Sequence, residues 1–175
     1  MEHKELIELE QQGKLLIGVD RAMARKFYTD IPIATIEEKT GEAPYFEKMT
    51  VWFAFLFGPI ALISSIVLGF LAFGWWGVIC LLLCPIVYFT YSSSSVMGSS
   101  KLTGITILFL IAVGVHFFGN LNSPWVTGFA GVFLFSLWCI RLLYCSVTLL
   151  LRNFVIRNER AYDYLSDYLV IRQVD

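Results

Sequence analysis

The chain has 175 residues, of which 57% are hydrophobic and only 15% are charged. A soluble domain averages nearer half apolar and a quarter charged. This composition excludes an ordinary soluble enzyme, a disordered chain and a small disulfide-bonded scaffold, and it indicates an integral membrane protein.

The charged residues are concentrated at the two ends of the chain. Seventeen of the 27 lie in 1–50 and eight lie in 152–175, which leaves Lys101 and Arg141 for the stretch between them. A water-soluble fold would need more polar groups to cover its surface. We therefore expect a polar cytosolic region over 1–50, a transmembrane domain over 51–151 and a polar cytosolic tail over 152–175.

The N-terminal region is predicted to contain amphipathic helices. Over 3–17, one helical face carries mostly apolar residues, namely Leu6, Leu9, Gly13, Leu16 and Ile17. Gly18 is predicted to end this helix.

A second short helix is predicted to begin after Asp20. Arg21 and Arg25 are i,i+4 neighbours with Lys26 beside them, which makes these cations candidates for contact with anionic lipid headgroups. The alternative is a helix packed on its own tail or on a neighbouring subunit. This alternative is favoured, because three cations are few and the segment overall is acidic. Further on, 31–36 is a candidate for a short strand.

Four apolar stretches are predicted to span the membrane as helices, and they are 51–72, 77–91, 102–118 and 124–151. A bilayer core of about 30 Å needs about 20 helical residues. The first stretch fits, the second and third are slightly short, and the fourth is long enough to project from the membrane as helix. The predicted fold is an all-α membrane protein of two helical hairpins.

The distribution of cations predicts the orientation. Eleven of the 13 Lys and Arg residues lie in the two tails, and Lys101 lies in the serine-rich loop 92–101. The positive-inside rule then places both termini and this loop in the cytoplasm. With no organelle signal in the sequence, the default location is a bacterial inner membrane.

Arg141 is the one charge deep within an apolar run. It lies 17 residues after Pro124, which is about 25 Å along a helix, and so within reach of the inner membrane boundary by snorkelling. Snorkelling is favoured over an anion site or a pore-lining role. Residues 51–151 contain no Asp or Glu, which disfavours a transporter coupled to ions or protons.

Other polar residues in the spans offer little chemistry. His116 lies near the outer end of the third span and is interpreted as an interfacial anchor rather than a titrating or gating group. Cys80 and Cys84, with Cys139 and His116, are weak zinc candidates because thiols in such stretches behave as small apolar side chains. No catalytic, metal-binding or cofactor-binding residues are predicted.

Small residues recur at helical spacing on two spans. Ala61, Ser65 and Gly69 form a stripe on the first span, and Thr127 and Gly131 repeat the spacing on the fourth. Such stripes serve packing within the chain and oligomerisation equally well.

The C-terminal tail is predicted to continue the fourth span as helix. Ala161, Leu165, Tyr168 and Leu169 share one face, with Tyr164 at its edge, and this apolar face is a candidate for binding a partner. Residues 169–174 are β-prone and are predicted to pair with 31–36.

These observations predict a non-enzymatic membrane subunit that self-associates, anchors a cytosolic protein partner, or does both. Its other contacts are membrane lipids, and no basic patch indicates nucleic acid. The alternative is a homo-oligomeric channel, whose pore candidates are Ser64, Ser65, Thr103, Thr106, Arg141, Ser146 and Thr148.

Overall fold

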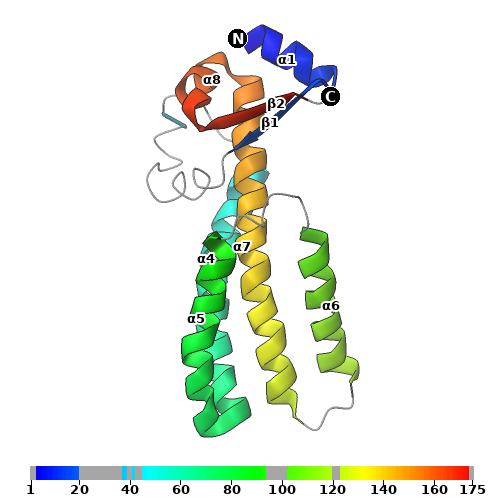
Figure 1. The fold of residues 1–175 in the computed structure, drawn as a ribbon, viewed down its shortest axis with the longest axis vertical. Coiled ribbons are helices and arrows are strands. Elements are labelled where there is room, and N and C mark those ends of the chain that lie inside the picture. The colour runs from blue at the N-terminus through cyan, green and yellow to red at the C-terminus, as the bar shows by residue number, and fades with distance from the viewer. Residues whose placement is uncertain are drawn as a thin grey trace. The chain divides into compact units, whose positions relative to one another are not determined.

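The chain divides into two compact units in the computed structural model, which describes residues 3–19, 37–38, 41, 45–93, 102–119 and 123–173. Met1–Met49 and Ser146–Asp175 together form one unit, here called the head. Thr50–Cys145 forms the other, here called the apolar unit. The described chain is mostly helical (Figure 1).

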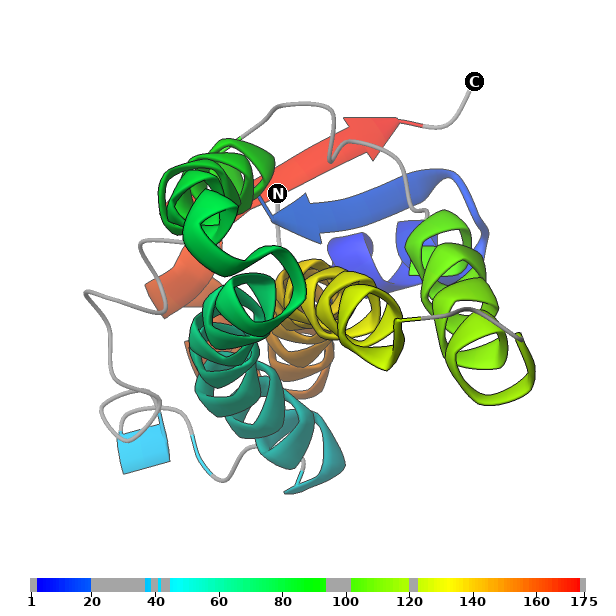
Figure 2. The same cartoon turned by 90° about the horizontal axis from the view of Figure 1, so that it is seen from below.

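A helical hairpin opens the apolar unit. Helix α4 (Tyr45–Phe73) is followed by a single 3₁₀ turn, η1 (Gly74–Trp76), and by α5 (Gly77–Ser93), and the two helices lie side by side (Figures 1 and 2). Gly74 has a φ of +58°, a left-handed conformation that glycine adopts without steric cost. At Gly77 an added Cβ would lie 2.6 Å from the Phe70 Cα, so this turn requires both glycines.

The second pair of helices is more loosely built. Helix α6 (Leu102–Phe118) has no buried residue, whereas α7 (Pro124–Arg157) lies between α6 and the hairpin (Figure 2). With 34 residues, α7 is about 51 Å long, and it contributes residues to both units.

Two stretches are long and apolar enough to cross a membrane. They are Lys48–Tyr91, which lies within the hairpin, and Pro124–Arg157, while Leu102–Phe118 is a shorter apolar helix. The structure thus supports a helical protein associated with a membrane.

The head contains a small antiparallel sheet that joins the two ends of the chain. Strand β1 (Leu15–Val19) pairs with β2 (Leu169–Gln173), with Leu15 opposite Gln173 and Val19 opposite Leu169. Leu15 and Ile17 are buried and Leu16 is 59% exposed, as the alternation of side chains along a strand requires. The all-α class is therefore incomplete, because each tail contributes a strand to this sheet.

The first helix is shorter than predicted. Helix α1 (His3–Gln11) ends before Gly13, whose φ is +69°. The Lys14 N–H donates to the Leu9 carbonyl at 3.0 Å and the Gly13 N–H to the Glu10 carbonyl at 2.9 Å, which is the Schellman pattern of a helix end. The prediction of helix over 3–17 is thus wrong beyond Gln11, because Gly13 ends the helix and the next residues enter β1.

The C-terminal tail changes direction at Asn158. This residue is extended, and its side chain accepts a hydrogen bond of 3.0 Å from the Arg160 N–H, which caps helix α8 (Glu159–Leu165). A 3₁₀ turn, η3 (Ser166–Tyr168), leads into β2. The predicted strand is confirmed over 169–173, but its partner among the described residues is β1, and 31–36 lies outside them.

Candidate functional site

Polar contacts in the head fasten the N-terminal helix to the end of α7. Arg152 donates from Nε to Glu10 Oε1 at 2.8 Å, and its Nη2 contacts the same oxygen. The Glu10 side chain is only 10% exposed, against 42% for Arg152. His3 adds a hydrogen bond of 2.7 Å from Nε2 to the Val155 carbonyl, and since a carbonyl only accepts, Nε2 carries the proton.

Beneath these contacts lies a core to which both ends of the chain contribute. Leu6 comes from α1, Val155 from α7, and Ala161 and Leu165 from α8, and all four are fully buried. Further buried apolar residues of the head are Leu15, Ile17, Val147, Leu150, Leu151 and Phe154. Neither tail supplies this core alone, so the head depends on both.

The head's core includes a residue that the sequence had placed on a partner-binding face. Leu165 is fully buried, while Tyr164 and Leu169 are half-buried and Tyr168 lies in η3. Ala161 and Leu165 do share one face of α8, but that face points into the head.

Exposed apolar side chains of the head lie elsewhere. Leu16 on β1 is 59% exposed, and Tyr45 and Phe46 at the start of α4 are 76% and 80% exposed. Sequence reasoning assigned Leu16 to the apolar face of a helix and so missed its exposure. The available signal was Gly13, because glycine often follows the end of a helix and β1 begins soon after it.

The predicted lipid-binding cations, Arg21, Arg25 and Lys26, lie outside the described residues.

The small-residue stripe on α4 packs within the chain. Ser65 is fully buried, Ala61 is 6% exposed, and Gly69 is buried so closely that an added Cβ would lie 2.9 Å from the Cys80 Cβ on α5. Ser65 donates to the Leu62 carbonyl of its own helix at 2.7 Å. This stripe lets α4 and α5 approach each other.

Helix α6 is linked to α7 by polar contacts near both of its ends. His116 Nδ1 lies 2.7 Å from Thr127 Oγ1, and the Thr127 hydroxyl donates to the Pro124 carbonyl at 3.1 Å. Because the hydroxyl has only one proton, Thr127 accepts the hydrogen bond from His116. Nearer the other end of α6, Trp138 Nε1 donates to Thr106 Oγ1 at 3.0 Å. The structure thus brings together His116 and Thr127, which the sequence treated separately because they lie on different helices.

Aromatic rings fill the space between these links. Phe109 of α6 lies 5.5 Å from Phe135 and 6.4 Å from Trp138 of α7, measured between ring centroids. The second member of the predicted stripe on α7, Gly131, is half-buried with no atom within 4 Å of an added Cβ.

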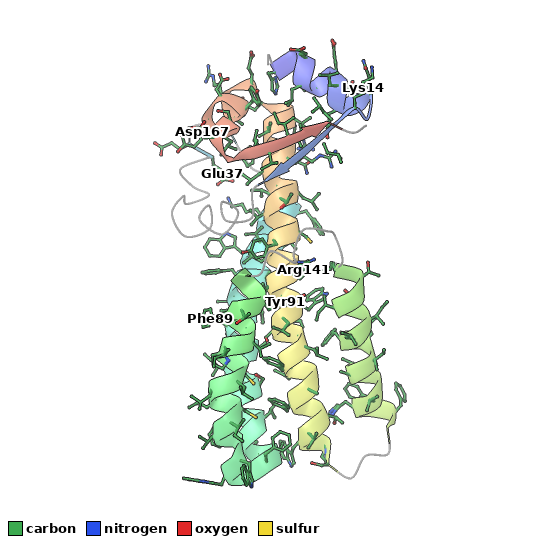
Figure 3. All side chains as sticks on the ribbon, in the orientation of Figure 1. Lys14, Glu37, Phe89, Tyr91, Arg141 and Asp167 are labelled. Atoms are coloured by element: carbon green, nitrogen blue, oxygen red, sulfur yellow. The ribbon has the colours of Figure 1, made fainter. Side chains whose placement is uncertain are left out.

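Arg141 is buried in the apolar unit, with an exposed fraction of 7%. It adjoins a cluster in which Leu137 and Ile140 of α7 are packed by partly buried side chains, including Tyr88 and Tyr91 of α5. Figure 3 shows Arg141 and Tyr91 at neighbouring heights along their helices. Across the described parts of the chain, no hydrogen bond or ion pair involves the Arg141 guanidinium.

The cysteines are free thiols. Cys84 and Cys139 are buried, and Cys80 and Cys145 are half-buried. Among the residues that the structure describes, no group of three His, Cys, Asp or Glu side chains is placed to hold a metal ion.

No known protein family, curated protein or solved structure matches the chain. A functional assignment therefore depends on the geometry of the head and of the apolar unit.

Proposed function

We propose that the protein is a non-enzymatic integral membrane subunit that self-associates and whose head holds a cytosolic protein partner at the membrane. The observation that carries this proposal is the construction of the head. Residues from α1, the end of α7 and α8 share one core, and β1 pairs with β2, so the two tails form one folded unit. A folded unit that depends on a membrane-embedded chain is suited to hold a partner at the membrane.

The proposed topology has four spans, α4 to α7, with both termini in the cytoplasm of a bacterium and the apolar unit in its inner membrane. The tails carry most of the cations, as the positive-inside rule requires of cytoplasmic segments. Trp75 and Trp76 in the turn between α4 and α5 are 87% and 72% exposed, as expected of aromatic residues at the opposite membrane interface.

The proposed partner contact centres on Leu16. This side chain is 59% exposed on the outward face of the sheet, and Val170 on the same face is half-buried. Leu16 and Val170 are apolar neighbours on this face, and adjoining exposed apolar side chains are typical of a contact surface.

Self-association is proposed for α6. Its apolar side chains are largely uncovered within the chain, with Leu108 and Leu110 at 54% and 59% exposure. The stripe on α4 is already used against α5, whereas no residue of α6 is buried, so α6 offers surface for a second copy or for lipid.

The test is co-purification of partners with the tagged full-length protein from its native membranes. We expect Leu16→Asp to reduce recovery of a cytosolic partner about tenfold, since it places a charge in an apolar contact. Ser166→Asp adds the same charge to an exposed site of the head and should leave recovery unchanged. If Leu16→Asp and a chain lacking 158–175 both recovered as much partner as the wild type does, the anchor would be contradicted.

The competing assignment is a homo-oligomeric channel. Two of its pore candidates, Ser65 and Thr106, direct their hydroxyl protons to carbonyls of their own helices. Liposomes containing the purified protein should therefore show no ion flux above protein-free liposomes. A conductance that is lost in Arg141→Leu would assign the channel instead.

A further inference from the structure

A buried guanidinium in the apolar unit has no acidic partner among the described residues. Arg141 is 7% exposed, and within the described residues it forms no ion pair. Residues 51–151 contain no Asp or Glu, so the sequence of this unit cannot supply a carboxylate. Burying a cation without a counter-charge is costly, so an anion from elsewhere would stabilise this site.

The position of Arg141 along α7 limits the source of that anion. From Pro124 to Arg141 the helix rises about 25 Å, which is close to the thickness of about 30 Å of a bilayer core. If Pro124 lies at one boundary, the guanidinium lies near the other, where the phosphates of the second leaflet begin. Phospholipid headgroups are the anions available at this depth.

The surroundings of Arg141 suit a lipid as well as a charge. Leu137 and Ile140 on the preceding turn are buried, and the partly buried Ile105, Phe133 and Tyr144 pack against them. Such apolar side chains can contact acyl chains while the guanidinium contacts the headgroup. The planar fork of an arginine matches two oxygens of one phosphate, which a lysine does not.

We propose that Arg141 binds the phosphate of an anionic phospholipid in the leaflet nearest the C-terminal part of α7. The proposal requires insertion of the apolar unit into a membrane, but it does not depend on any partner of the head. A lipid held in this way would complete the charge balance of the apolar unit.

The experiment is native mass spectrometry of the full-length protein in detergent, titrated with phosphatidylglycerol or with phosphatidylcholine of the same acyl chains. We expect the wild type to bind phosphatidylglycerol about tenfold more tightly, and Arg141→Gln to abolish that preference, as expected for loss of charge-assisted hydrogen bonds. Arg160→Gln removes the same charge from an exposed position of the head and should retain the preference.

Three outcomes overturn the proposal. The first is an Arg141→Gln protein that still prefers phosphatidylglycerol. The second is displacement of the lipid by excess inorganic phosphate, which would assign a soluble anion rather than a headgroup. The third is equal affinity of the wild type for the two lipids. This outcome does not depend on whether Arg141→Gln folds.

Discussion

The head and the apolar unit are stabilised by different means. The head buries leucine and valine side chains from both ends of the chain and fastens α1 to α7 with an ion pair. The apolar unit leaves large side chains such as Ile63, Leu82 and Leu110 about 60% exposed, which would be costly in water but not in lipid. Its helices are held instead by close approach at glycines and by a few hydrogen bonds. Apolar burial should therefore dominate the stability of the head, and close packing should dominate that of the apolar unit.

The largest effect is expected from the core of the head. Leu165→Ala removes a fully buried side chain of α8 and should lower the free energy of unfolding of the head by about 2–5 kcal/mol. Hydrogen exchange of the backbone amides of β1 and β2 measures this, because both strands lie in the same unit.

The matched control for that change is an exposed leucine of the same unit. Leu16→Ala alters a side chain that is 59% exposed and should change stability by no more than about 0.5 kcal/mol. If the two variants exchanged at equal rates, burial would not be what holds the head together.

A smaller effect is expected at the closest helix approach in the apolar unit. Gly69→Ala places a Cβ 2.9 Å from the Cys80 Cβ, and the overpacking should cost about 1–3 kcal/mol in thermal unfolding of the detergent-solubilised protein. Exchange of the β1 and β2 amides should stay unchanged, because the strain lies in the other unit.

Gly131→Ala is the control for this second change. Its added Cβ has no atom within 4 Å, so α7 should tolerate it or gain slightly from the better helix propensity of alanine. Equal losses at both glycines would show that helix packing at Gly69 has no special role.

Local sequence patterns predicted the apolar unit better than the head. The helix over Leu102–Phe118 begins and ends where predicted, because the apolar run is bounded by a serine-rich loop and by Gly119. The pairing of Leu15 with Gln173 joins residues at opposite ends of the sequence, and no local periodicity contains that information. In the sequence, Leu16 fits the apolar face of a helix. The left-handed conformation of Gly13 ends that helix, and Leu16 lies in β1 instead.

The candidate site shows the same division. The sequence singled out Arg141 because a lone charge in an apolar run is visible by inspection. Its burial, by contrast, depends on how α7 packs within the apolar unit, and the link between His116 and Thr127 depends on how α6 and α7 meet. Such contacts between helices are tertiary and are not encoded in spacing along one helix.

The smallest effect is expected where α6 meets α7. Thr127→Val keeps the shape of the side chain but removes the oxygen that accepts from His116. Hydrogen bonds between transmembrane helices contribute about 0.6 kcal/mol on average, because the separated helices find other polar partners, so thermal stability in detergent should fall only slightly. Thr127→Ser keeps the hydroxyl and should restore most of the loss. If Thr127→Val destabilised the protein more than Gly69→Ala did, hydrogen bonding rather than close packing would dominate the apolar unit. The aromatic contacts of Phe109 would then be secondary to the His116 link in holding α6 against α7.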